Sequence, residues 1–371
     1  MARVRLTDVA AEAGVSAATV SKYLNGHHGE MSAATRERIA AVVERMGYRP
    51  NGVARNLRLE RSRTIGVILA DIRNPYSSAM LEELSAQAAA AGYTLTCAIS
   101  GNDSVKEAAA VERLLETGAD GLIVNTCGGN DDLLREANRR APVLLLDRDL
   151  DQRAGSADQP ALDLVTSDNA SLVRALVHEV AGRDYAGCAR INLLTEPDST
   201  SSIRRERALT FMRELSLHGL AGSTLALQHD PRKAARQLAG LADAHIPLGL
   251  IAINGLVFQQ LFEAVALSGL LVPKRLRVAT FDEYPWNRVL FGGVTTAAQD
   301  TRSIAESALE RLIARIDDAG RGGADREPAP WRREVPGTVI ARASTSAPSP
   351  RQLPRLGTIS PAAPPPRLKR F

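Results

Sequence analysis

Residues 5–26 read RLTDVAAEAGVSAATVSKYLNG and contain two short amphipathic helices separated by a turn. The first helix is predicted to begin at Thr7, its cap, and to end before Gly14. Gly14 tolerates the positive φ of a tight turn, and Ser16 is suited to cap the helix that follows. The second helix is predicted over residues 17–24. Neither helix is long enough to bury a core alone, so both must pack against something else.

A third helix supplies that support. It is predicted from its cap Ser32 to near Met46, with Ile39 and Val42 turned inward. Two short helices joined by a glycine-containing turn and braced by a third form a helix-turn-helix, whose second helix can enter the major groove of DNA. A generic helical hairpin has the same spacing, so spacing alone leaves both interpretations open.

The charge distribution favours a polyanionic partner for this first segment. Residues 1–63 carry eleven Lys and Arg residues against six Asp and Glu, whereas the 371-residue chain has a formal net charge of only +4. A basic segment is typical of nucleic-acid binding, although a solvated basic face would have the same composition.

The remaining composition excludes several classes of protein. The three cysteines, Cys97, Cys127 and Cys188, are far apart in apolar stretches, which argues against a disulfide framework or a metal site. No secretion-signal pattern and no apolar run of about 18 residues is present. We therefore expect a soluble, cytoplasmic protein.

From residue 64 the sequence alternates between short apolar strands and amphipathic helices. The strands TIGVILAD, YTLTCAIS, DGLIVNT and APVLLLD form a first set, and the pattern restarts at LDLVTSD, residues 162–168. Such strands between helices predict parallel sheets covered on both faces. The two similar halves predict two Rossmann-like lobes, with a binding cleft between the carboxyl ends of their strands.

Two long matches carry a family resemblance. LTDVAAEAGVSAATVSKYLNG and TRERIAAVVERMGYRPNGVARNL, residues 6–26 and 35–57, resemble the DNA-binding head of the lac repressor family (LacI/GalR). The resemblance continues to about residue 345 through motifs such as TIGVI, NPY, SDN, VPKRLRVATFDEYPW and GVTTAAQD. It implies an all-α helix-turn-helix head followed by a two-lobed α/β domain like that of periplasmic binding proteins.

The resemblance also implies domain boundaries. The head covers residues 1–49, a hinge helix and linker cover 50–63, and the effector-binding and dimerisation domain covers 64–345. The chain crosses between the lobes three times. The implied lobes are residues 64–164 with 294–322, and residues 165–293 with 335–345. Residues 346–371, which are rich in Pro, Ser and Arg, are predicted to form a disordered tail.

The head and hinge of the family supply the implied DNA contacts. Hydroxyl side chains position such a protein on phosphates, whereas Ala17, Ala18 and Lys22 would face base edges. The family usually has Arg at the position of Lys22, and lysine lacks the bidentate fork, so we expect weaker discrimination there. Leu57 would wedge into the minor groove, unless this segment is a plain linker. The implied DNA-binding residues are Thr7, Ser16, Ala17, Ala18, Thr19, Ser21, Lys22, Asn25, Val53, Ala54, Leu57 and Arg58.

Effector contacts are implied residue by residue in the same way. Asp282 would accept hydrogen bonds from ligand hydroxyls, and Arg207 would grip the ligand. Alternatively, Arg207 pairs with Glu206 or Glu310 on a solvated face, and Asp282 caps a turn. Ser201 stands where some relatives have Arg, and Phe258 where Ala is common, so the ligand cannot be assigned by analogy. The implied effector-binding residues are Tyr76, Ser77, Asn125, Arg148, Ser201, Arg207, Asn254, Phe258 and Asp282.

These observations predict a sequence-specific transcriptional regulator rather than an enzyme. We expect a repressor that binds a pseudopalindromic double-stranded operator as a homodimer and responds to a sugar or sugar-like polyol between its lobes. A purine-like or acidic ligand stays open, as does the sign of the ligand's effect. No cofactor, metal, catalytic residue or membrane partner is expected. The alternatives are a cytoplasmic sugar-binding protein and an enzyme on a two-lobed fold; the chain has no P-loop, GxGxxG, HExxH or GxSxG motif.

Overall fold

The computed structural model describes residues 4–24, 29, 31–48, 61–150, 161–182, 185–196, 201–242, 245–319 and 329–346. The chain divides into two compact units, Met1–Thr64 and Ile65–Phe371. The predicted hinge residues Val53, Ala54, Leu57 and Arg58, together with Asn25 and the tail from residue 347, lie outside the described residues. No helix in the described part of the chain is long and apolar enough to cross a membrane.

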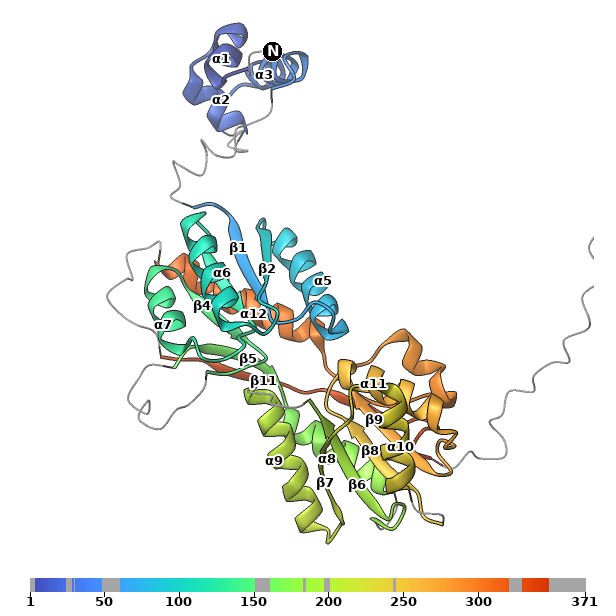
Figure 1. The fold of residues 1–371 in the computed structure, drawn as a ribbon. Helices are drawn as coiled ribbons and strands as arrows, with labels where there is room; N and C mark the ends of the chain where they lie inside the picture. Colours follow the sequence, from blue (N-terminus) through green and yellow to red (C-terminus); the bar gives the residue numbers. More distant parts are fainter. Residues whose placement is uncertain are drawn as a thin grey trace, which may run out of the picture. The chain divides into compact units, whose positions relative to one another are not determined.

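The first unit is a three-helix head around a small apolar core. Its helices are α1 (Leu6–Ala13), α2 (Ala17–Leu24) and α3 (Ala33–Arg45) (Figure 1). Val9, Val20 and Ile39 are fully buried in this core, which also contains Val42, and Ile39 and Val42 are the residues predicted to face inward. The helices were therefore correctly predicted from the period of the apolar residues.

The caps of these helices agree with the prediction at two of three positions. Ser16 Oγ accepts a hydrogen bond from the Thr19 N–H at 3.1 Å, and Ser32 Oγ accepts one from the Thr35 N–H at 3.2 Å. The prediction that Thr7 caps α1 is wrong. The helix begins one residue earlier, at Leu6, and the Asp8 carboxylate closes its end by accepting from the Arg5 N–H at 2.8 Å.

The first lobe of the second unit is a six-stranded parallel sheet with helices on both faces (Figure 1). Helices α5 (Pro75–Ala90) and α12 (Thr301–Ala319) cover one face, and α6 (Ser104–Glu116) and α7 (Asp131–Arg140) cover the other. Gly66 has no Cβ, and one built there would lie 2.6 Å from Leu122, so glycine permits this close packing. The strands, in spatial order, are β11 (Arg332–Val335), β5 (Asp163–Ser167), β4 (Val143–Leu146), β3 (Gly121–Val124), β1 (Thr64–Leu69) and β2 (Thr94–Ile99).

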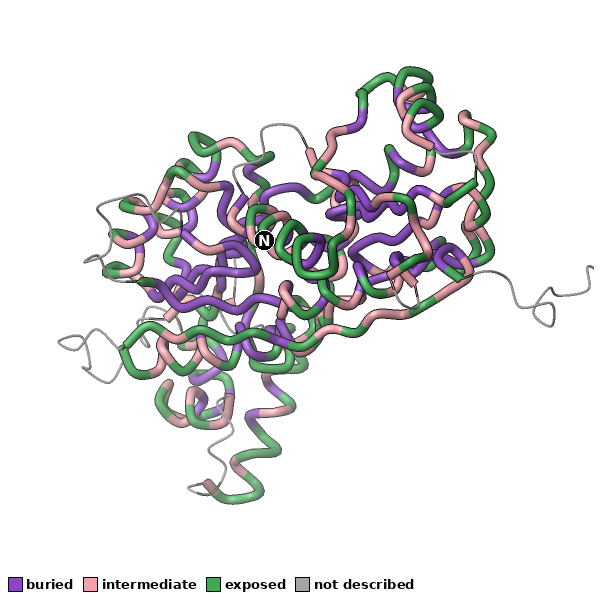
Figure 2. Tube along the Cα trace, turned by 90° about the horizontal axis from the view of Figure 1, so that it is seen from below, coloured by how far each residue is buried: buried purple, intermediate pink, exposed green. Residues whose placement is uncertain are grey.

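The second lobe repeats this design around one continuous core. Helices α8 (Asn169–Ala181), α9 (Ser202–Leu217), α10 (Pro231–Leu241) and α11 (Gly255–Ser268) pack on its sheet, and Figure 2 shows buried residues running along the strands. All strand pairs are parallel except β10 with β12. The strands, in spatial order, are β12 (Thr338–Ile340), β10 (Thr295–Ala298), β9 (Leu276–Phe281), β8 (Leu248–Ala252), β6 (Arg190–Thr195) and β7 (Gly222–Ala226).

Three segments connect the lobes, but two boundaries differ from the predicted ones. Residues 295–298 were assigned to the first lobe, yet β10 pairs with β9 of the second sheet, so the chain returns to the first lobe only at α12. Similarly, β5 extends to Ser167 in the first sheet, beyond the predicted boundary at residue 164. Strand pairing, which the local apolar pattern does not encode, decides both positions.

A buried carboxylate at the start of β5 stabilises the first lobe. Asp163 on β5 is 2% exposed and accepts hydrogen bonds from Arg311 Nε at 2.8 Å and from the Trp331 N–H at 2.8 Å. Arg315 lies 3.4 Å from the same carboxylate. Asp163 thereby joins α12 and the residue before β11 to the sheet, although these segments lie far apart in sequence.

Candidate functional site

Five of the twelve residues predicted to contact DNA lie on α2. Ala18 and Lys22 are exposed, whereas Ala17 is half-buried against the core of the head. The hydroxyls of Ser16 and Thr19 lie 2.9 Å apart at the start of the helix. This arrangement places two hydroxyls at the amino end of a short helix and a cation in its last turn.

A cavity of about 810 Å³ lies between the two lobes of the second unit. Its lining residues follow the carboxyl ends of strands in both lobes, as expected for parallel α/β sheets. Asp71, Asn102 and Arg148 follow β1, β2 and β4, while Glu196 and His229 follow β6 and β7. The lining also includes Arg73, Cys127, Ser201, Arg204, Leu256, Gln259, Gln260 and Glu263.

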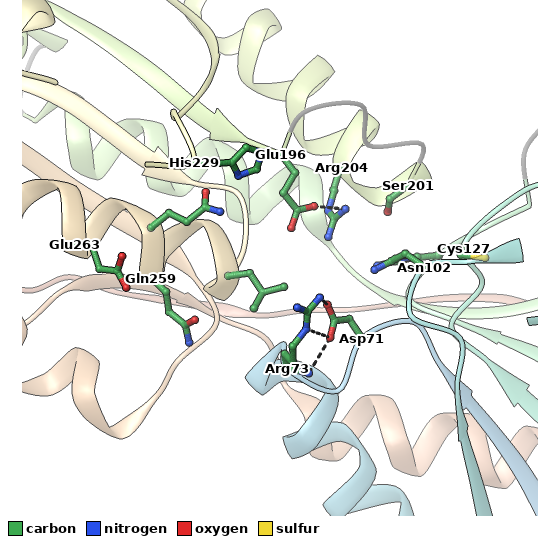
Figure 3. A pocket seen from close by; sticks show the side chains of 13 residues that line it. Asp71, Arg73, Asn102, Cys127, Glu196, Ser201, Arg204, His229, Gln259 and Glu263 are labelled. Carbon is green, nitrogen blue, oxygen red and sulfur yellow. Dashed lines mark hydrogen bonds and ion pairs between the residues drawn. The ribbon is translucent and has the colours of Figure 1, made fainter. Parts of the chain in front are cut away.

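Two ion pairs stand on facing sides of this cavity (Figure 3). In the first lobe, Arg73 donates from Nη2 to Asp71 Oδ2 at 2.8 Å, and this hydrogen bond lowers the pKa of Asp71. In the second lobe, Arg204 pairs with Glu196. Burial, together with the nearby cations Arg148 and Arg207, lowers the pKa of Arg204. The cavity is therefore polar on both sides and contains more than one arginine.

Arg207 organises a buried polar network in the second lobe. Its Nε donates to Asn169 Oδ1 at 2.7 Å, and its Nη1 donates to the Ile253 carbonyl at 2.7 Å. The guanidinium also lies 3.7 Å from the centre of the Phe281 ring. With a 4% exposed side chain, Arg207 is buried rather than placed on a solvated face, so the alternative pairing with Glu206 or Glu310 is wrong.

Asp282 is held in the same network by a crossing segment. Its Oδ1 accepts from Gln299 Nε2 at 2.6 Å, its Oδ2 accepts from the Gly255 N–H at 3.2 Å, and its backbone has a left-handed φ of 73°. Gln299 Oε1 in turn accepts from Arg207 Nη2 at 3.2 Å and from Ser167 Oγ at 2.7 Å. Burial raises the pKa of Asp282, an effect that Arg207 opposes.

The first lobe presents buried polar atoms that lack partners among the described residues. Tyr76 Oη and Asp147 Oδ1 are both of this kind. Burial raises the pKa of each group, and Arg207 and Arg148 oppose that rise. The Asn125 side chain, by contrast, donates to the Leu146 carbonyl at 2.9 Å. Such unpaired buried groups are costly unless something else binds them.

Comparisons with known proteins agree with this arrangement. Residues 5–51 match the model of bacterial regulatory proteins of the lacI family, and residues 185–345 match a periplasmic binding protein-like domain. The HTH-type transcriptional regulator KdgR of Bacillus subtilis (strain 168) is 31% identical over 346 residues, covering 91% of this chain and 97% of KdgR. PtxS of Pseudomonas plecoglossicida is 35% identical over 317 residues, covering 85% of this chain and 89% of PtxS. The chain belongs to the lacI family.

A solved structure shows the same fold as this LacI-family chain. The crystal structure of the lac repressor dimer bound to operator and the anti-inducer ONPF superposes with a TM-score of 0.73 at 23% identity. It covers 93% of this chain and 100% of the repressor chain. The predicted fold, a helix-turn-helix head with a two-lobed α/β domain, is confirmed. Because the family consists of transcriptional regulators, the prediction that the chain is not an enzyme is confirmed as well.

The predicted effector residues of this LacI-family chain fall into three groups. Arg148 and Ser201 line the cavity directly. Phe258 does not: it is 1% exposed within the core of the second lobe, because its position on α11 faces the sheet, and its assignment to the ligand wall is corrected here. The others are buried and lie outside the lining of the cavity: Tyr76 and Ser77 on α5, Arg207 on α9, and Asn125, Asn254 and Asp282 just after strands.

The sequence analysis did not identify two residues of the site, Asp147 and Gln299. Asp147 directly follows β4, a position that could have identified it. Gln299 could not have been found in this way, because its role depends on the crossing segment meeting Arg207 and Asp282.

Asn254, which was predicted to contact the ligand, has a structural role in this structure. Its Oδ1 caps α11 by accepting from the Val257 N–H at 2.9 Å, and its Nδ2 donates to Glu196.

Proposed function

We propose that this LacI-family regulator is a repressor that binds a pseudopalindromic operator as a homodimer and releases or retains it according to a small molecule bound between its lobes. One observation carries the effector part of the proposal. Gln299, on the second crossing segment, joins Arg207 and Asp282 of the second lobe to Ser167 at the first crossing segment. A ligand that contacts Arg207 or Asp282 therefore acts on the segments about which the lobes move.

The coupling follows from differential contacts. A ligand held by side chains of both lobes makes different contacts when the lobes change their relative position, and only such a difference shifts a conformational equilibrium. Typical coupling free energies between two sites are about 1–3 kcal/mol, a five- to 150-fold change in affinity. We expect a sugar-like effector, because carboxylate, amide and hydroxyl groups together suit ligand hydroxyls. The related sucrose operon repressor of Klebsiella pneumoniae, 27% identical over 356 residues, supports repression.

The head supports operator recognition through α2. Ser16 and Thr19 would contact phosphates, while Ala18 packs on base edges and Lys22 reaches guanine O6 or N7. A two-fold dimer reads the same half-site twice, which makes the operator pseudopalindromic. A repressor of this kind acts where the genomic DNA is, in the cytoplasm.

The test selects operators from a random-sequence duplex library with the full chain and measures their binding by fluorescence anisotropy. We expect enrichment of sequences with two inverted half-sites. Lys22→Ala should weaken binding to the selected sequence about tenfold, because one base contact is worth roughly 1–3 kcal/mol. Lys233→Ala, an exposed lysine on α10, is the matched control and should change nothing. Lack of enrichment, or equal effects of the two variants, would contradict the proposal.

A further inference from the structure

The interlobe cavity contains a buried cation that no carboxylate neutralises directly. Arg148 is 8% exposed and lines the cavity. Its Nη1 donates to two neutral acceptors, Asn102 Oδ1 at 3.0 Å and the Thr126 carbonyl at 3.1 Å. Among the residues that the structure describes, no carboxylate lies within ion-pair distance of Arg148. The other two arginines of the lining, Arg73 and Arg204, each have a carboxylate partner.

The unpaired carboxylate of the lining does not offset this cation. Glu263 is exposed on α11, so solvent screens its charge, whereas Arg148 is buried. The charge of Arg148 opposes the rise that burial causes in the pKa of Asp147, but Asp147 lines a separate small cavity of about 170 Å³ and forms no ion pair with Arg148 among the described residues. Among the described residues that line the large cavity, Arg148 is therefore the arginine without a carboxylate partner, and its guanidinium can bind an anionic group of a ligand.

A second and independent feature points to the same kind of ligand. The amino end of α9, a 16-residue helix, meets the cavity at Ser201, and a helix of this length carries a partial positive charge there. Ser201 is 5% exposed, and its Oγ is buried and has no hydrogen-bond partner among the residues that the structure describes. Arg204 projects into the cavity from the first turn of the same helix (Figure 3). Hydroxyl and helix end together form a receptor for an anionic oxygen.

We propose that the effector is a sugar acid whose single carboxylate is bound by Arg148 of the first lobe and by Ser201 and the amino end of α9 in the second lobe. This inference rests on the proposed function and specifies the ligand class of its effector site. One unpaired arginine balances one negative charge, which favours a carboxylate over a phosphate dianion. Because Arg148 belongs to the first lobe and Ser201 to the second, the ligand carboxylate connects the two lobes.

The experiment compares acids with neutral polyols of the same carbon chain. The full-length protein is titrated calorimetrically with D-gluconate, D-galactonate and D-mannonate, and with D-glucitol, D-galactitol and D-mannitol, at constant ionic strength. Glucose 6-phosphate against glucose distinguishes a phosphate from a carboxylate. We expect at least one acid to bind at least a hundredfold more tightly than its alditol, and more tightly than the phosphate ester.

Variants then assign the binding to these residues. Arg148→Gln and Ser201→Ala should each weaken acid binding at least tenfold, whereas Arg148→Lys should restore part of it because the charge is kept. Arg213→Gln, an exposed arginine on α9, is the matched control. A circular dichroism melt verifies that each variant is folded. If Arg148→Gln does not fold, the acid affinity of Arg148→Lys is measured in its place.

Three outcomes overturn the proposal: alditols that bind as well as acids, a preference for the phosphate ester, or no binding by either panel. Operator binding by the same protein is measured separately. If operator binding persists while the acids fail, the sugar-acid assignment falls and the DNA-binding part of the proposed function stands. If the selected operator is not bound either, the proposed function falls with it.

Discussion

The two lobes present their polar side chains to the interlobe region in different states. In the second lobe, Arg207 and Asp282 are satisfied by Asn169, Gln299 and backbone groups. In the first lobe, Tyr76 Oη and Asp147 Oδ1 are buried and have no partner in the described part of the chain. Arg207 and Asp282 are thus pre-organised by their own contacts, whereas Tyr76, Asp147 and, in the second lobe, Ser201 offer atoms that bind a ligand at lower cost because no existing bond must be broken.

The comparison predicts opposite effects of mutation on stability. Removing a satisfied group leaves its partners unpaired, which costs free energy. Removing an unpaired buried group takes away a cost that the folded protein already carries. Stability and ligand affinity should therefore fall together when Arg207 is replaced and change in opposite directions when Tyr76 or Asp147 is replaced.

The largest effect is expected for Arg207→Met. The substitution leaves Asn169 Oδ1 and the Ile253 carbonyl without their donor and removes the cation next to Asp282. Breaking such a buried charge network costs about 3–5 kcal/mol. Urea unfolding followed by circular dichroism measures this loss, and Arg213→Met on the exposed face of α9 is the control. Equal midpoints for the two variants would show that the second lobe is not pre-organised by Arg207.

Asp282→Asn should act mainly on the ligand. It keeps the size of the side chain but removes its charge, and a hydrogen bond to a charged group is worth about 1.5–3 kcal/mol. We expect effector affinity to fall tenfold to a hundredfold by calorimetry. Operator affinity without effector should stay within experimental error. Unchanged effector affinity would remove Asp282 from the site, and lost operator binding without effector would make it a structural residue.

Asp147→Asn should stabilise the protein at neutral pH, by about 1 kcal/mol, because it removes the negative charge that burial destabilises while keeping the size and polarity of the side chain. Burial raises the pKa of Asp147 in the folded state, so its contribution to stability is lost as the pH rises through that folded pKa. The gain from Asn should therefore shrink as the pH falls toward about 3.9, the unfolded value. Urea unfolding at several pH values tests this, and a gain independent of pH would contradict it.

Tyr76→Phe should have the smallest effect on stability. It deletes one buried hydroxyl that has no partner among the described residues, so the free energy of unfolding should stay equal or rise by less than about 1 kcal/mol. Effector affinity should fall at the same time if the first lobe uses this hydroxyl. A thermal melt paired with an effector titration measures both quantities. Loss of stability would show that Tyr76 Oη has a structural partner.

The head was predicted most completely because its information is local. The apolar period and the cap residues Ser16 and Ser32 are read within one or two turns of helix, and the core built from Val9, Val20 and Ile39 follows from them. The error at Thr7 is also local. The Asp8 carboxylate, and not the Thr7 hydroxyl, accepts a hydrogen bond at the amino end of α1, and the helix begins one residue earlier than predicted.

The alternation of strands and helices likewise determined the two α/β lobes, because a strand buried on both faces must be apolar throughout. Strand ends then placed Arg148, Asn125 and Asp282 near a ligand region. The sequence by itself therefore determined the fold class, the family and the side of each sheet on which the site lies.

Only the tertiary structure decided which residues meet. The lobe to which β10 belongs depends on its pairing with β9. The sequence of β10 does not specify this partner, because another apolar strand could pair with it equally well. The burial of Phe258 depends on the rotation of α11 against the sheet. The bridge from Arg207 through Gln299 to Ser167 joins three segments, and the pairing state of Arg148 depends on neighbours from two further loops. Hydrogen bonding is short-ranged and directional, so a one-dimensional pattern cannot specify which distant groups satisfy it and which are left for a ligand.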